Sequence, residues 1–326
     1  MPSSTPLLHD VTQAATILQR GGVVAFATET VYGLGGNALD VHAVARIFAA
    51  KERPHFDPLI VHLAEITDLD RVVSCVPPIA RKLIDRFWPG PLTLVLPKQP
   101  AVPDLVTAGL PTVAVRLPAH PQARDLIRRS GVPVAAPSAN PFGRISPTTA
   151  QHVLDFLSGK IDAVLEGGAC QVGVESTVLE CSVDNQVRLL RPGGLPVEAI
   201  EELIGPLRGK APTILDQHSP QVSPGMLAQH YAPRTPLEIV SDWSAGPVGE
   251  QIGILTLTPI SNPQDYGAVE VLSAEGSLTE ATAGFFAALR RLEAAPVQRI
   301  LAKPFPETGL GRALNDRLTR AATIQK

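Results

Sequence analysis

Hydroxyl and cationic side chains gather in the first sixty residues. Thr28 and Thr30 follow a short apolar run, and Lys51 and Arg53 follow an amphipathic helix. If the extended conformation continues past the apolar run, Thr28 and Thr30 share one face and Glu29 points to the other. Two cations beside paired hydroxyls suit a polyphosphate. They also complement the negative end of the helix dipole, which explains them without a ligand.

An arginine on a predicted strand is a second candidate for binding an anionic ligand. Residues 112–116 read as a strand whose alternation places Thr112, Ala114 and Arg116 on one face. An arginine on an inward face needs an anionic partner. The pattern leaves two partners open for Arg116, a structural Asp or Glu or the carboxylate of a substrate held by two hydrogen bonds.

Polar residues also follow the strand predicted at 132–136. Ser138 and Asn140 come just after it, at the position where open α/β sheets bind ligands, although ordinary turns favour the same residue types. A capping box beginning at Thr148 predicts the next helix. That assignment leaves Ser146 beside a helix N-terminus, where backbone N–H groups can bind phosphate oxygens.

A hairpin carries two more candidates. Strands are predicted at 178–181 and 186–190, with Ser176 just before the first and Arg191 just after the second. Ser176 lacks the G-x-S-x-G context of a hydrolase nucleophile. It is therefore interpreted as a ligand-binding hydroxyl or a turn residue.

Several other chemistries are disfavoured. The segment 33–38 matches the dinucleotide fingerprint G-x-G-x-x-A, but it neither follows its strand directly nor opens a helix. Cys75, Cys170 and Cys181 are odd in number without C-x-x-C spacing, which indicates neither disulfides nor a zinc site. No neighbouring histidine marks Cys170 as a nucleophile.

Composition and charge narrow the function classes. The 326 residues are 44% apolar and 18% charged, with a net charge of -3 and no basic excess in either half, so nucleic-acid binding is disfavoured. No apolar run approaches a membrane span, and the N-terminus lacks the features of a signal peptide. These observations predict a cytoplasmic protein that is not bound to a membrane.

The chain divides into three parts. Residues 1–205 are predicted to form an α/β domain and 206–236 a linker, because the linker is rich in Pro, Gly, Gln and Ser with little apolar periodicity. The linker nevertheless contains Met226, His230 and Tyr231. Residues 237–326 return to alternating strands and helices, which predicts a smaller Rossmann-like α/β domain.

Together these residues resemble a known family. The resemblance lies in Thr28-Glu-Thr-Val-Tyr-Gly-Leu34, Lys51-Glu-Arg53, Pro58-Leu-Ile-Val-His62, Trp88-Pro-Gly-Pro-Leu-Thr93, Val113-Ala-Val-Arg-Leu-Pro118, Ala136-Pro-Ser-Ala-Asn140, Gly173-Val-Glu-Ser-Thr177 and Ser223-Pro-Gly-Met-Leu-Ala-Gln-His-Tyr-Ala-Pro233. The order and content are similar to the YrdC-type threonylcarbamoyl-AMP synthases in their two-domain form. The resemblance implies an open, twisted mixed sheet with flanking helices, followed by the small α/β domain.

The family pattern also implies roles for single residues. Lys51 and Arg53 would stabilise the triphosphate. Threonine would contact Thr30, His62, Arg116, Ala136 through its backbone, and Ser176. ATP would contact Arg53, Asp57, Thr112, Ser138, Asn140, Ser146, Arg191 and Tyr231. Asp57 departs from the pattern, where an amide is usual, and His62 can also be explained as a core histidine at a strand end. Tyr231 would reach the nucleotide from a linker that acts as a lid over the cleft.

The implied reaction joins ATP, L-threonine and bicarbonate into threonylcarbamoyl-AMP and pyrophosphate, the first step toward threonylcarbamoyladenosine in tRNA. Mg²⁺ would be held by the substrate phosphates and not by a protein metal site. A tRNA threonylcarbamoyl-transferase complex would take the product, with weak RNA binding as a further expectation. Two alternatives remain, a double-stranded-RNA-binding module and an ATP-dependent regulator that uses the same cleft.

Overall fold

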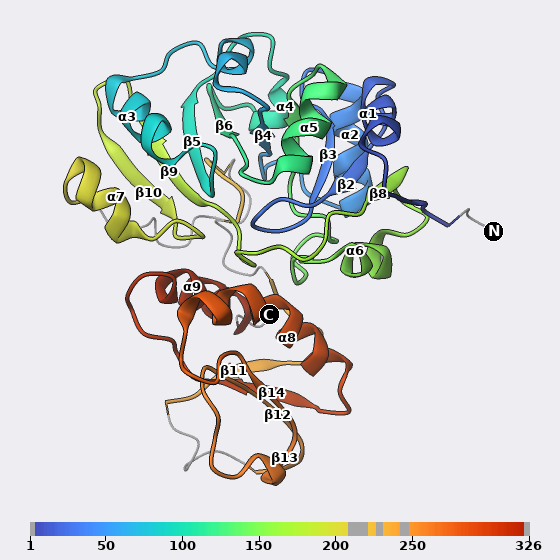
Figure 1. Ribbon diagram of the computed structural model, residues 1–326, viewed down its shortest axis with the longest axis vertical. Coiled ribbons are helices and arrows are strands. Elements are labelled where there is room, and N and C mark those ends of the chain that lie inside the picture. The colour runs from blue at the N-terminus through green and yellow to red at the C-terminus, as the bar shows by residue number, and fades with distance from the viewer. Residues whose placement is uncertain (1–3, 208–220, 226–230, 242–247, 323–326) are drawn as a thin grey trace.

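The chain folds around two β-sheets, one formed within residues 7–191 and the other within residues 237–302 (Figure 1). The computed structural model describes residues 4–207, 221–225, 231–241 and 248–322. Most of the predicted linker, including Met226 and His230, lies outside the described residues. None of the helices in the described ranges is long and apolar enough to cross a membrane.

The first sheet has ten strands and mixes both strand directions. Its order is β1-β8-β2-β3-β7-β4-β6-β5-β9-β10, with parallel pairs such as β4 with β6 and antiparallel pairs such as β5 with β6. The strands are β1 Leu7–Leu8, β2 Val24–Phe26, β3 Gly33–Asn37, β4 Ile60–His62, β5 Leu92–Pro97, β6 Thr112–Arg116, β7 Val134–Ala135, β8 Ala163–Leu165, β9 Thr177–Cys181 and β10 Val187–Arg191. The expected mixed sheet is confirmed.

Helices flank this sheet on both sides (Figure 1). They are α1 Val11–Gln19, α2 Val41–Lys51, α3 Pro78–Phe87, α4 Asp104–Thr107, α5 Pro121–Ser130, α6 Ala150–Leu157 and α7 Val197–Ile204, with a short 3-10 helix at Ile66–Arg71. Strand alternation decides which residues face the main core. On β6, Val113 and Val115 enter it, whereas Ala114 and Arg116 point to the opposite face, where the candidate site lies.

Two local predictions were wrong, and one rejection is supported. Residues 29–31 bend, so the extended conformation does not continue past β2. The glycine-rich segment 33–37 forms β3 between β2 and β7, which agrees with its rejection as a phosphate loop. The cap of α6 is Thr149, whose hydroxyl accepts from the His152 backbone N–H, and not Thr148.

The second sheet is parallel and carries two helices. Its order is β11-β14-β12-β13, from β11 Leu237–Ile239, β12 Gly249–Thr256, β13 Tyr266–Val271 and β14 Arg299–Ala302. A short 3-10 helix spans Pro263–Asp265, followed by α8 Leu278–Ala294 and α9 Gly311–Ala322. Figure 1 shows α8 and α9 between the two sheets, so this small α/β domain presents its helical face to the first domain.

The two domains share one apolar cluster. Val31 and Val174 of the first domain pack with Phe286 of α8 and with Tyr231. Gly173 has a φ of +79°, and a Cβ there would lie 2.3 Å from the carbonyl oxygen of Thr282, so only glycine permits this close approach to α8. The two domains are therefore closely packed where Gly173 meets α8.

Candidate active site

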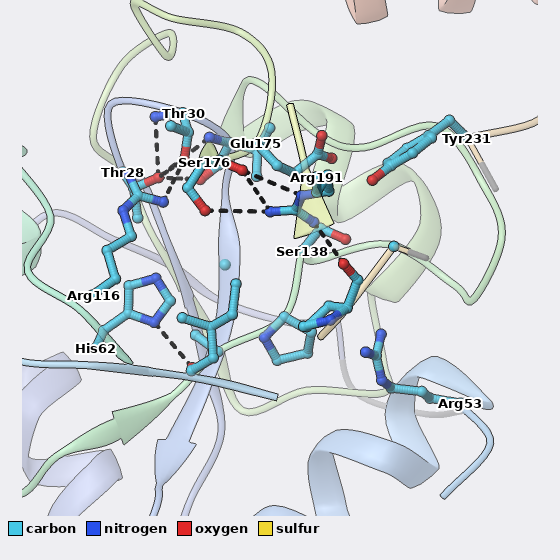
Figure 2. A pocket seen from close by; sticks show the side chains of 17 residues that line it. Thr28, Thr30, Arg53, His62, Arg116, Ser138, Glu175, Ser176, Arg191 and Tyr231 are labelled. Atoms are coloured by element: carbon cyan, nitrogen blue, oxygen red, sulfur yellow. Dashed lines mark hydrogen bonds between the residues drawn. The ribbon is translucent and has the colours of Figure 1, made fainter. Parts of the chain in front are cut away.

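A cavity lies against the first sheet, on the face to which Arg116 points (Figure 2). Its volume is about 40 Å³, well below the roughly 300–1,000 Å³ of an ordinary ligand pocket. It is lined by Thr28, Thr30, Val31, Gly33, Arg53, Ile60, His62, Arg116, Ala136, Pro137, Ser138, Glu175, Ser176, Arg191, Pro224, Gly225 and Tyr231. The cavity is therefore small in the described structure.

Thr28 and Thr30 lie side by side at one end of the cavity. Their hydroxyl oxygens are 2.8 Å apart, and Thr28 Oγ1 donates to the carbonyl oxygen of Val31 at 2.7 Å. The predicted proximity is present, but a bend produces it: the backbone N–H groups of Thr30 and Val31 both approach Thr28 Oγ1 at 3.2 Å. The turn fixes the two hydroxyls in the cavity wall.

Arg116 has a structural acid as its partner. Its Nη2 lies 2.6 Å from Glu29 Oε1, and its Nη1 donates to Thr30 Oγ1 at 2.8 Å. Strand alternation predicted that Glu29 would point away from Thr30. Instead, both residues contact Arg116. Burial alone would raise the pKa of Glu29, but the Arg116 guanidinium outweighs burial and lowers it, so Glu29 is ionised.

His62 is neutral in this wall. Burial, with a further contribution from Arg116, lowers the pKa of His62 to about 3. Its Nδ1 lies 3.2 Å from the carbonyl oxygen of Ile60, which can only accept, so this contact places the proton on Nδ1. A neutral imidazole can accept a hydrogen bond or fill space, and it adds no charge to the cleft.

Ser176 and Arg191 form the middle of the wall (Figure 2). Arg191 Nη2 donates to the Ser176 carbonyl oxygen at 2.9 Å and to its Oγ at 3.2 Å. Ser176 Oγ also lies 2.7 Å from Thr93 Oγ1. The Nη1 atom of Arg191 donates to the carbonyl oxygen of Pro224 at 3.1 Å, so the linker backbone holds a donor that faces the cavity.

Arg53 lines the other end of the cavity and forms a salt bridge with Asp57, the residue that departs from the family pattern. Its Nη2 lies 2.9 Å from Asp57 Oδ2 and donates to the Pro58 carbonyl oxygen at 2.7 Å. Burial raises the pKa of Asp57, while Arg53 and Lys51 oppose that rise. Asp57 thus reduces the net positive charge that Arg53 brings to the cleft.

Lys51 does not line the cavity. Its fully buried Nζ donates to the carbonyl oxygens of Asn140 and of Ser138, the latter at 2.5 Å. Burial, reinforced by Arg53, holds the pKa of Lys51 well below its usual range. In this state Lys51 fixes the loop that follows β7.

The other predicted residues divide into two groups. Ser138, Ala136 and Tyr231 line the cavity, Tyr231 from the linker. Asn140, Ser146 and Thr112 do not. The Asn140 amide donates to Pro141 and Arg144, Ser146 Oγ donates to Glu175, and Thr112 lies at the far end of β6 from Arg116.

Sequence reasoning placed Thr28 in the cleft but did not assign two other residues that shape this site, Glu175 and Arg317. Thr28 and Glu175 line the cavity, and Arg317 of α9 reaches Glu175 from the second domain. The motif Gly173-Val-Glu-Ser-Thr177 contained Glu175 without indicating a role. One signal was available for Arg317, since it interrupts the apolar stripe of α9 formed by Ala313, Leu314 and Leu318.

The chemistry of the wall favours positioning and charge neutralisation. It brings together hydroxyl groups and the guanidinium groups of Arg53, Arg116 and Arg191. Near this site, burial raises the pKa of Cys170 to about 12, so its thiol is not an activated nucleophile. In the described parts of the chain, no group of three or more His, Cys, Asp or Glu residues is arranged to hold a metal ion.

Sequence comparison covers nearly the whole chain. Residues 16–193 match the Sua5/YciO/YrdC family model, described as "Telomere recombination", and residues 195–323 match the model of the "Threonylcarbamoyl-AMP synthase, C-terminal domain". A threonylcarbamoyl-AMP synthase of Bacillus subtilis is 45% identical over 324 residues, covering 96% of this chain and 92% of the relative. One of Pyrococcus abyssi is 43% identical over 326 residues, covering 95% and 93%.

A solved structure agrees over the same extent. The crystal structure of Pyrococcus abyssi Sua5 complexed with L-threonine superposes with a TM-score of 0.86 at 42% identity, covering 96% of this chain and 94% of that one. Both domains are thus included in the similarity.

Proposed function

The chain belongs to the family of threonylcarbamoyl-AMP synthases, and from this premise we propose how its cleft makes threonylcarbamoyl-AMP and pyrophosphate from L-threonine, bicarbonate and ATP. The observation that carries the proposal is the division of the cavity wall. Thr30, Arg116 and His62 lie at one end, and Arg53 and Tyr231 at the other, with Ser138, Ser176 and Arg191 between them (Figure 2).

Threonine is proposed to bind at the end that contains Arg116. A carboxylate there would accept from the Arg116 guanidinium, beside the hydroxyls of Thr30 and Ser176 and the backbone of Ala136. His62 would offer a neutral ring against the amino acid. The Pyrococcus abyssi protein was solved with L-threonine, which supports this choice of ligand.

ATP is proposed to bind at the other end and the middle. Arg53 and Arg191 would neutralise phosphate charge, Ser138 would donate to a phosphate oxygen, and Tyr231 would contact the nucleotide. The cavity lining does not include Lys51, Asp57, Thr112, Asn140 or Ser146. Their contact with ATP remains a prediction for the substrate-bound state.

The reaction needs no enzyme nucleophile. The threonine amine adds to CO₂ formed from bicarbonate and loses a proton, which gives a carbamate. A carbamate oxygen attacks the α-phosphorus of ATP, the bond from that phosphorus to the bridging oxygen breaks, and pyrophosphate leaves with the electron pair. The attacking oxygen is already anionic, so the wall has to align the two substrates and stabilise phosphate charge.

Mg²⁺ fits this cleft as an ion carried by ATP. The carboxylates nearest the cavity, Glu29, Asp57 and Glu175, each pair with an arginine. Phosphate oxygens and water would therefore supply most of its ligands. When bound, Mg²⁺ adds positive charge on the phosphates, while Arg53 and Arg191 orient them.

The linker is proposed to act as a lid. Pro224, Gly225 and Tyr231 line the cavity, and the Pro224 carbonyl oxygen occupies a donor of Arg191. ATP can reach Arg191 only after this segment withdraws, and a phosphate oxygen would then replace the carbonyl. We further propose that the enzyme acts in the cytoplasm and passes its product to a tRNA threonylcarbamoyl-transferase complex.

The test is pyrophosphate release by the purified protein with ATP and Mg²⁺, omitting threonine or bicarbonate in turn. Release is expected only with both. Arg191→Met should lower the rate by about 10²- to 10³-fold, the usual loss for one electrostatic stabiliser. Arg188→Met is the matched control, because Arg188 lies on the same strand but pairs with Glu180 at the surface.

Equal ATP turnover without threonine would instead identify an ATP-dependent regulator or hydrolase. Tight, salt-sensitive binding of double-stranded RNA without pyrophosphate release would favour the RNA-binding alternative.

A further inference from the structure

The second domain inserts an arginine behind the cleft. Arg317 of α9 is fully buried, its Nε donates to Glu175 Oε2 at 2.7 Å, and its Nη1 donates to the carbonyl oxygen of Pro192 at 3.0 Å. Both acceptors belong to the first domain, and Glu175 lines the cavity. A residue of α9 therefore contacts the cleft wall from behind.

Glu175 is held as an ionised group at this position. Burial alone would raise the pKa of Glu175, but the guanidinium groups of Arg317 and Arg191 and the hydroxyl of Ser146 outweigh burial and lower it. Ser146 Oγ donates to Oε1 at 2.6 Å, while Arg317 holds Oε2. Each carboxylate oxygen thus has one strong donor.

A carboxylate in this wall is unfavourable for an anionic substrate. It would repel phosphate, and it would attract Arg191, the cation proposed to bind ATP. Arg317 offsets both effects from the side away from the cavity, and it shares its charge between Glu175 and Asp316 of α9, whose Oδ2 lies 2.5 Å from Nη1.

The same guanidinium also contacts the lid. Its central carbon lies 5.0 Å from the centroid of the Tyr231 ring, and Phe286 of α8 lies 5.6 Å from that ring. Tyr231 has a φ of +64°, a left-handed conformation that a non-glycine residue adopts only when its surroundings hold it. The second domain thus positions one wall residue and one lid residue through Arg317.

We propose that Arg317 is a positioning residue for the reaction: it neutralises Glu175 so that Arg191 is available to ATP, and it makes the ATP site depend on docking of the second domain. The inference rests on the proposed function. It assigns the second domain the task of completing the ATP site.

The test is steady-state kinetics of Arg317→Met. The KM for ATP should rise by about 10- to 100-fold, the value of one charge-assisted hydrogen bond, with a smaller change in the KM for threonine. Arg312→Met is the matched control, because Arg312 is also on α9 and its Nη2 lies 3.4 Å from Glu198 of the first domain at the exposed rim. It should keep the parent KM for ATP within about twofold, as expected for an exposed ion pair.

Two further readouts separate charge neutralisation from simple packing. Arg317→Met combined with Glu175→Gln should recover most of the lost ATP affinity, because the carboxylate that needs neutralising is gone. In Arg317→Met alone, the KM for ATP should improve as the pH falls from 8 to 6, since an unpaired buried Glu175 takes up a proton more readily. The parent enzyme should show a smaller change over that range.

No recovery in the double variant, together with a pH-independent KM, would overturn the inference. If Arg317→Met does not fold, Arg317→Lys carries the test. Lysine keeps the charge but lacks the planar fork that reaches both Glu175 and Pro192, so the KM for ATP should rise by less than about tenfold, and a larger rise would count against the inference. Parent enzyme that releases no pyrophosphate would overturn both proposals, whereas an active parent with an unaffected Arg317→Met overturns only this one.

Discussion

At the scale of single residues, Asp57 limits how strongly Arg53 can attract an anion. Asp57→Asn keeps the shape but removes the charge, leaving Arg53 buried beside a neutral acceptor. We expect the free energy of unfolding to fall by about 1.5–3 kcal/mol without ligand and ATP to raise the melting temperature more than in the parent. Thermal unfolding with and without ATP measures both.

Asp104→Asn is the control for this change, because Asp104 pairs with Lys98 at the surface. It should behave like the parent protein. A variant Asp57→Asn that loses its response to ATP would show instead that the carboxylate itself contacts the nucleotide.

His62 makes stability depend on pH. Its folded pKa of about 3 lies below the ordinary value of 6.5, so below about pH 6.5 the unfolded chain binds a proton that the folded chain does not. As the pH is lowered from about 6.5 to 3, this group should therefore lower the free energy of unfolding by up to about 1.4 kcal/mol per pH unit. Urea unfolding of the parent and of His62→Asn at several pH values measures the contribution as the difference in slope. Equal slopes would contradict it.

The residue types in the sequence indicated which side chains line the cleft, but they did not predict how those side chains contact one another. The hydroxyls of Thr28 and Thr30 meet as expected, but through a bend that strand alternation does not predict. Arg116 needed an anion, and the sequence could not choose between a substrate and Glu29, because that choice depends on where the bend places the neighbouring side chain.

At the scale of elements, the C-terminus of α2 contains backbone strain that a single substitution can remove. Glu52 has a φ of +54° and ends the helix in the left-handed region, while its side chain only pairs with Lys160 at the surface. Glu52→Gly should raise the free energy of unfolding by about 1 kcal/mol relative to Glu52→Ala, because both lose the ion pair and only glycine avoids the Cβ penalty. Chemical denaturation of the two variants tests this, and equal stabilities would contradict it.

The elements themselves were largely predictable. The hairpin predicted at 178–181 and 186–190 is confirmed, because β9 pairs with β10 in antiparallel fashion. One exception was β3, where the glycines of Gly33–Asn37 give little strand propensity. That strand exists because Gly35 leaves room for Phe26 and Val134 on the neighbouring strands, which is a tertiary effect.

At the scale of the whole molecule, Gly173 tests whether the domains must stay closely docked. Gly173→Ala places a Cβ against the α8 backbone and should move the second domain away, which would lower pyrophosphate release and raise the radius of gyration in small-angle scattering. Gly109→Ala is the control, since Gly109 has the same φ of +79° but open space around it. It should lose about 1 kcal/mol of stability and keep its activity. Equal activity in both variants would show that close docking is dispensable.

The sequence did not predict how the two domains dock. The division of the chain into two α/β units followed from composition and periodicity, but neither property indicates which faces meet. Arg317 and Glu175 illustrate this limit: the interrupted apolar stripe of α9 indicates a buried arginine but not its partner, and the contact exists only in the assembled molecule.

The Arg317–Glu175 contact also sets an order of events during synthesis. The two residues are 142 positions apart, so at about 5–20 residues per second a ribosome needs roughly 7–30 s to reach the second after making the first. During that interval the nascent first domain has Glu175 without its counter-ion, and the ATP end of the cleft is incomplete. By the proposed role of Arg317, a polypeptide released before α9 is made should therefore consume ATP poorly.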